Sequence, residues 1–275
     1  MIDSTEDQAA GLRRLFRKAP PAVVALYVAG RQPAAVAIRT AYRIAGRAER
    51  VLVLDEAQGE RALSQALDLP PGPDLLSVLG AKVHPLDLIQ QVPGLVGRVP
   101  AGAAALALPL LDDERRDRLV GALGLLHRHA GYVLIHSCCE AAADPSPFIF
   151  AAPRRLVVAE VGRTGATESY RVIKRLAEAG AGSIHVAAAG ARSRSDAQAF
   201  FDALENLVRR HVGIPLAWLG ELERDDIARG LDSEVGASRS RDAEAAFLRR
   251  LVALGRSGRM TGPTGRSRLG APGCR

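Results

Sequence analysis

Residues 22–35 read Ala-Val-Val-Ala-Leu-Tyr-Val-Ala-Gly-Arg-Gln-Pro-Ala-Ala, an apolar run that ends in a short turn containing glycine. An uninterrupted apolar run of this length, bounded by glycine, predicts a strand that is buried on both faces. Proline is tolerated in the first turn of a helix, so residues 33–46 are expected to form a helix directly after the turn. Residues 51–54 predict a second buried strand, which ends at Asp55.

The same alternation of strand and helix continues along the chain. Further short strands are expected at residues 95–100, 132–136, 156–160, 183–188 and 216–219. Helical patterns separate them at residues 60–67, 75–79, 112–128, 166–179 and 195–211. Strands that are apolar throughout and alternate with helices predict an α/β fold, a mainly parallel sheet with helices on both faces in three layers.

The positive charge of the chain is concentrated at its C-terminal end. After residue 236 there are nine arginines and two acidic residues, and nine minus two equals the formal charge of +7 of the whole chain. The remainder is therefore neutral overall, and the basicity concerns partners rather than the fold. The longest uncharged apolar stretch, residues 101–111, is shorter than the ~18 residues that span a bilayer.

The two ends of the chain differ from its centre. Residues 1–20 predict an arm with a short amphipathic helix at residues 4–18, ended by two prolines. Residues 21–235 predict the α/β domain, residues 236–257 a linker and a basic amphipathic helix, and residues 258–275 a disordered basic tail. The acidic start and the three cysteines, two of them adjacent, indicate a reduced, cytoplasmic protein.

Three motifs, taken in order, resemble a known family. They are Asp7-Gln8-Ala9-Ala10-Gly11-Leu12-Arg13 in the arm, Val99-Pro100-Ala101-Gly102 after the third expected strand, and Thr167-Glu-Ser-Tyr-Arg-Val-Ile-Lys174. With the strand–loop–helix–strand–Asp order of residues 22–55, they resemble the MinD/ParA-type P-loop ATPases from about residue 22 to residue 231. Within that superfamily the chain looks most like the flagellar-number regulators (FlhG, FleN or YlxH).

The resemblance implies a partner as well as a P-loop NTPase, MinD-like fold. In the family, an Asp-Gln-Ala-x-x-Leu-Arg motif engages a signal-recognition-type GTPase, FlhF, of the flagellar placement system. Carried onto this chain, that role falls on Asp7, Gln8, Leu12, Arg13 and Phe16. Flagellar switch-ring proteins or a flagellar transcription regulator are further candidate partners, and a positioning factor for a non-flagellar machine is an alternative. The other reading of the arm is that it packs on its own domain.

The expected phosphate-binding loop departs from the family pattern. A working P-loop needs several glycines, a lysine for the phosphates and a hydroxyl residue for Mg²⁺. Residues 29–35 hold a single glycine, Gly30, no lysine, and alanine where the hydroxyl belongs, while Pro33 removes an amide donor. Arg31 is the remaining group that could contact an anion.

Three other nucleotide positions have also changed. Ala57 replaces the second acidic residue after Asp55, His136 stands where the family has a Mg²⁺-organising Asp, and residues 186–190 lack the Asn that faces adenine. The sequence therefore predicts a vestigial nucleotide site of Gly30, Arg31, Asp55 and His136, with no catalytic residue and no cofactor. A divergent enzyme that still binds ATP and Mg²⁺ through Arg31, Asp55 and Glu56 is the alternative.

A further cluster of potentially reactive side chains lies at the end of the strand expected at residues 132–136. His136, Cys138 and Cys139 lack the spacing and the fourth ligand of a zinc site, and lack the orienting third group of a nucleophile, so no metal is predicted.

The last helix has apolar residues beside arginines, which is typical of a membrane-surface helix. The membrane-binding residues would be Phe247, Leu248, Arg249, Arg250, Leu251 and Leu254, at the inner membrane. The alternative is a terminal helix docked on the core. The basic tail lacks aromatic interleaving, which argues against nucleic acid.

Overall fold

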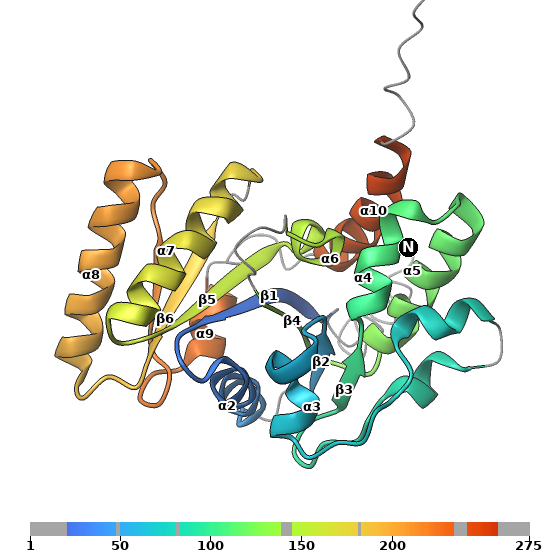
Figure 1. Cartoon of the computed structure of the whole chain (residues 1–275), viewed down its shortest axis with the longest axis horizontal. Coiled ribbons are helices and arrows are strands. Elements are labelled where there is room, and N and C mark those ends of the chain that lie inside the picture. Colours follow the sequence, from blue (N-terminus) through green and yellow to red (C-terminus); the bar gives the residue numbers. More distant parts are fainter. Residues whose placement is uncertain are drawn as a thin grey trace, which may run out of the picture.

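The computed structural model describes residues 21–47, 50–80, 83–138, 145–180, 183–233 and 241–257. Its strands are β1 (Ala22–Ala29), β2 (Val51–Asp55), β3 (Gly97–Pro100), β4 (Tyr132–Ser137), β5 (Arg154–Glu160), β6 (Ile184–Ala189) and β7 (Ala217–Glu221). These seven strands of the described chain form one sheet in the order β3-β2-β4-β1-β5-β6-β7, and every pairing is parallel (Figure 1).

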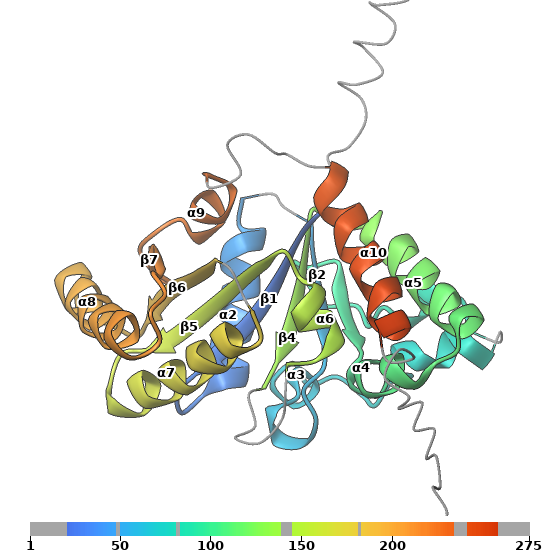
Figure 2. The same cartoon turned by 90° about the horizontal axis from the view of Figure 1, so that it is seen from above.

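Helices cover both faces of this sheet (Figure 2). On one face lie α2 (Pro33–Ala45), α3 (Leu63–Ala66) and α9 (Ile227–Ser233). On the other lie α4 (Gly102–Ala107), α5 (Asp113–His127), α6 (Pro147–Ala151), α7 (Arg163–Glu178), α8 (Arg194–His211) and α10 (Arg241–Ser257). Short 3-10 helices complete the described chain: η1 (Gly59–Arg61), η2 (Leu75–Gly80), η3 (Pro85–Leu88) and η4 (Leu108–Leu110).

The core is two apolar layers, one on each side of the sheet. Successive strand residues alternate between the layers, so Val23 packs on the α5 and α10 side whereas Val24 packs on the α2 side. This alternation follows from the two-residue period of a strand, and both layers are apolar because helices cover both faces. The fold class expected from the sequence, a parallel three-layer α/β/α domain, is therefore confirmed.

Several local expectations were wrong in detail. Residues 60–67 and 75–79 form short 3-10 and helical turns rather than regular helices, and the third strand begins at Gly97 rather than residue 95. The helices α4, α6 and α9 were not expected. The signal for α6 was present, because Ser146 caps it by accepting from the Ile149 N–H at 3.2 Å and Pro147 occupies its first turn.

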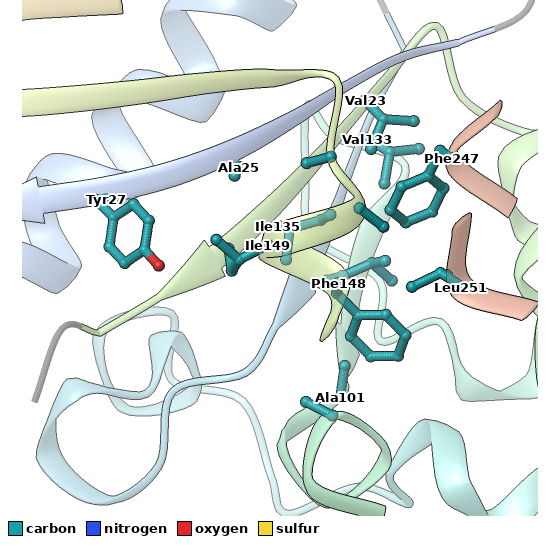
Figure 3. Packing of buried hydrophobic residues seen from close by; sticks show 14 of the residues in the cluster. Val23, Ala25, Tyr27, Ala101, Val133, Ile135, Phe148, Ile149, Phe247 and Leu251 are labelled. Atoms are coloured by element: carbon teal, nitrogen blue, oxygen red, sulfur yellow. The ribbon is translucent and has the colours of Figure 1, made fainter. Parts of the chain in front are cut away.

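The helix α10 packs on the core, in the arrangement given above as the alternative to a membrane-binding face. Phe247 and Leu251 are fully buried, and Leu248 and Leu254 pack partly buried against the same layer. Figure 3 shows Phe247 and Leu251 pointing from α10 toward Val23, Val133 and Phe148. The Phe247 ring also stacks on His127 of α5, with centroids 5.6 Å apart.

The apolar side chains proposed for lipid thus have an intramolecular role, and only Arg249 and Arg250 of that set are exposed. The structure shows the arrangement of the alternative, a terminal helix docked on the core. Among the helices of the described residues, none combines the length and apolarity needed to cross a bilayer. The arm at residues 1–20 and the tail at 258–275 lie outside the described residues, so the division of the chain at those points stays a prediction.

Candidate functional site

The candidate site lies where the carboxyl ends of β1, β2, β4 and β5 meet. After β1 the chain moves outward to β2 and β3, returns beside β1 as β4, and then continues on the other side as β5. In open parallel sheets, ligand sites form at the carboxyl edge near such a change of direction. All four vestigial positions expected from the sequence, Gly30, Arg31, Asp55 and His136, lie at this edge, at or just after the ends of β1, β2 and β4.

Two carboxylates accept hydrogen bonds from the backbone amides of the loop between β1 and α2. The Gly30 N–H donates to Oε2 of Glu168 at 2.7 Å, and the Arg31 N–H donates to Oε2 of Glu160. Glu160 is the last residue of β5 and Glu168 lies on α7. The Arg31 side chain is exposed, and this residue meets Glu160 through its backbone amide.

Glycine is required at position 30 for this contact. Its φ is +150°, which side chains rarely adopt, and a Cβ there would lie 2.1 Å from Oε2 of Glu160. The single glycine left in the loop is therefore the residue that lets a carboxylate approach the backbone.

A buried polar network surrounds Asp55 at the end of β2. Its Oδ2 accepts from Nε of Arg98 at 2.7 Å and from the Leu63 N–H at 2.9 Å. Its Oδ1 lies 2.8 Å from Nδ1 of His136 and accepts from the Ala57 N–H at 3.2 Å. Both carboxylate oxygens are consequently used by the protein itself.

The partners of Asp55 keep it ionised. Burial disfavours its charge, but the hydrogen bond and positive charge of His136, together with those of Arg98, outweigh burial and lower the pKa of Asp55. Arg98 was not singled out from the sequence. The sequence did contain a signal for it, because Arg98 lies within an expected buried strand. A buried arginine needs an acidic partner, so its position indicated a pair with a carboxylate.

Glu56, the next residue, points to the other side of the sheet. Its Oε1 accepts from Oγ of Ser146 at 2.6 Å, and its Oε2 is buried without a hydrogen-bond partner among the described residues. Burial, opposed in part by hydrogen bonds from Ser146 and Ser137 and reinforced by the charge of Asp55, raises the pKa of Glu56 to about 7. Burial therefore favours the protonated form of Glu56 far more than water does.

The other sequence candidates do not assemble into a metal site. In the parts of the chain that the structure describes, no group of three His, Cys, Asp or Glu side chains could hold a metal ion. Cys138 is half-buried, and Cys139 lies outside the described residues. On His136, Nδ1 faces Asp55, while Nε2 is buried without a hydrogen-bond partner in the described chain.

The residues at this edge do not fit Mg·ATP as they are arranged. The Gly30 and Arg31 amides that would meet phosphate already meet carboxylates, whose charge repels phosphate. His136 stands at the expected metal position, and imidazole is a poor ligand for Mg²⁺. The neighbouring carboxylate of Asp55 is shared between Arg98 and His136.

The fold is similar to that of the cell division protein MinD. The chain is similar to the MinD protein of an Aquifex aeolicus MinC:MinD cell division complex, at 18% identity and a TM-score of 0.53, covering 84% of this chain and 96% of that one. MinD of Aquifex aeolicus alone gives 17% identity, a TM-score of 0.51, and 84% and 97% coverage. McdA from Cyanothece, in its complex with ATP, is 20% identical to this chain, with a TM-score of 0.48. The match covers 86% of this chain and 97% of that one. The sequence matches no protein-family model and no curated protein sequence.

Proposed function

We propose that this protein is a non-catalytic regulator of flagellar number or placement. It acts in the cytoplasm by binding a partner GTPase of the signal-recognition type through residues 7–13. Its MinD-like domain serves as the scaffold that carries this arm, and the vestigial nucleotide site has a structural role.

One observation supports the non-catalytic part of this proposal above the others. The loop amides at Gly30 and Arg31 are bonded to Glu168 and Glu160, in the position where a P-loop protein would bind phosphate. The buried contacts of Asp55 with Arg98 and His136 support the same conclusion, because they leave the carboxylate without a free oxygen for Mg²⁺. A regulator whose nucleotide site is occupied by its own side chains acts by binding partner proteins.

The partner-binding part is supported by the motif Asp7-Gln8-Ala9-Ala10-Gly11-Leu12-Arg13, which lies outside the described residues. An amphipathic helix of fewer than ~15 residues is marginal alone in water and gains stability on a partner. Leu12 and Phe16 would bury apolar surface while Gln8 and Arg13 make polar contacts. The similar Aquifex MinD is seen assembled with MinC, so the fold is used in at least one protein assembly.

The test measures GTP turnover by the partner GTPase in the presence of the full-length protein. We expect wild type to change the turnover and Arg13→Ala to abolish the change. The matched control is Arg14→Ala, which removes the same type of side chain one position outside the motif. Equal behaviour of the two variants, or no binding of the wild type, would remove the proposed mechanism.

The competing function is a divergent ATPase of the same fold. Calorimetry of the full chain with millimolar Mg·ATP decides between the two. Saturable heat, together with release of phosphate, would establish the enzyme and displace the proposal.

A further inference from the structure

The loop between β1 and α2 has an internal anion on each of two consecutive amides. In P-loop proteins the corresponding amides converge on phosphate oxygens at the amino end of the following helix. Here the acceptors are Oε2 of Glu168 for Gly30 and Oε2 of Glu160 for Arg31. A carboxylate is the side-chain group that most resembles a phosphate oxygen pair in charge and in acceptor geometry.

The backbone fixes Glu160 in this place. The parallel pairing of β1 with β5 runs to Ala29 opposite Ala159, so Gly30, which follows β1, comes beside Glu160, the last residue of β5. The absence of a side chain on Gly30 then leaves the space that the carboxylate of Glu160 occupies.

The position of Glu168 depends on a close approach of α7 to β5. A Cβ on Gly165 would lie 1.9 Å from the carbonyl oxygen of Glu160, so only glycine allows the first turn of α7 to lie this near the strand. Glu168, three residues later, consequently reaches across to the Gly30 amide. Residues 138 positions apart in the sequence meet because two glycines allow two close approaches.

From this geometry we propose that Glu160 and Glu168 act as built-in substitutes for phosphate: they hold the loop in its anion-bound arrangement permanently and exclude phosphate-containing ligands from it. This inference rests on the proposed non-catalytic function and deepens it. A nucleotide-gated relative would change its loop when ATP binds or leaves, whereas this chain keeps the loop in a single state. Its partner binding is then independent of the nucleotide supply.

The first experiment removes the two charges while keeping the acceptor oxygens. Thermal unfolding of wild type, the double variant Glu160→Gln/Glu168→Gln and the control Glu178→Gln is measured with increasing inorganic pyrophosphate. Glu178 is an exposed residue of the same helix. We expect no pyrophosphate-dependent rise in Tm for wild type and the control, and a saturable rise for the double variant, corresponding to at least a tenfold gain in affinity. A rise for wild type, or none for the folded double variant, would overturn the inference.

The second experiment needs only wild type and one single variant, and it holds even if the double variant does not fold. Amide hydrogen exchange at Gly30 and Arg31 is measured with and without millimolar Mg·ATP. We expect slow exchange that Mg·ATP does not alter in wild type, and exchange at Gly30 at least tenfold faster in Glu168→Ala. Fast exchange in wild type, or slowing by Mg·ATP, would contradict the inference. Neither experiment involves the partner GTPase, so loss of partner binding with these results intact would remove only the proposed function.

Discussion

Nε of Arg98 lies 2.7 Å from Oδ2 of Asp55, and both side chains are almost completely withdrawn from solvent, at 6% and 0% exposure. The pair joins β3 to β2 at the edge where the strands end. A charge withdrawn from water is tolerated only while its partner is present, so this contact holds the third strand, at the edge of the sheet, to the candidate site.

We expect Arg98→Met to lower the free energy of unfolding by about 3–5 kcal/mol, because it leaves the buried carboxylate of Asp55 without its arginine partner. Urea denaturation at pH 7 measures the change. The control is Arg39→Met, which breaks a half-exposed pair with Glu223 and should cost less than about 1 kcal/mol. A cost for Arg98→Met as small as that of the control would show that the buried pair has no special role.

Glu56 makes the free energy of unfolding depend on pH, and the direction of this dependence follows from its raised pKa. Its pKa is raised in the folded state to about 7 from an ordinary 4.5, so the folded state binds its proton more tightly than the unfolded state. Stability from this group is complete below about pH 4.5 and is lost as pH rises toward and through 7. The loss is on the order of 3 kcal/mol by pH 8.

Glu56→Gln should remove that loss, because glutamine accepts from Ser146 without becoming charged. The difference in unfolding free energy between variant and wild type is measured from pH 4.5 to 8 and should grow in favour of the variant. Asp55 does not interfere, because its pKa is lowered and its contribution is lost only as the pH falls below its ordinary value. A difference that stays flat across the range would contradict the assignment of the raised pKa to Glu56.

The sequence was sufficient to predict the fold. Continuous apolar strands such as Val51–Asp55 exist only where helices cover both faces, so their alternation with helical patterns defines the three layers. The family resemblance placed Gly30, Asp55 and His136 in one vestigial site, and in the structure Asp55 and His136 are in contact at 2.8 Å.

The partners of these residues were not predictable from the same patterns. Glu168 lies 138 residues from Gly30, and Arg98 lies 43 residues from Asp55. Which carboxylate meets which amide depends on strand order and on close approaches at single glycines, and these are properties of the packed structure. The docking of α10 on the core could not be decided from the sequence either, because an amphipathic pattern does not distinguish a lipid surface from the protein's own core.

The docked position of α10 leads to a large expected cost for Phe247→Ala. The side chain is completely buried between α5 and the sheet and stacks on His127, so its removal should lower the free energy of unfolding by about 3–5 kcal/mol. The control is Leu110→Ala in η4, where the side chain is 87% exposed and the expected change lies within about 0.5 kcal/mol. Equal, small effects would instead favour a helix that leaves the core for a membrane surface.

The approach of α7 to β5 can be tested at Gly165. A Cβ at this position would lie 1.9 Å from a backbone oxygen, that of Glu160, and neither the strand nor the first turn of the helix can rotate away as a flexible side chain would. We therefore expect Gly165→Ala to lower the free energy of unfolding by about 2 kcal/mol or more, and to speed amide exchange at Gly30 by withdrawing Glu168.

Gly121 supplies a control of opposite sign. It lies in the exposed face of α5 with nothing within 4 Å of the added Cβ, so Gly121→Ala should stabilise the protein by about 0.5–1 kcal/mol through helix propensity alone. If Gly165→Ala were also stabilising, glycine would not be required at position 165. The contact between Glu168 and the loop would then owe nothing to the close packing of α7.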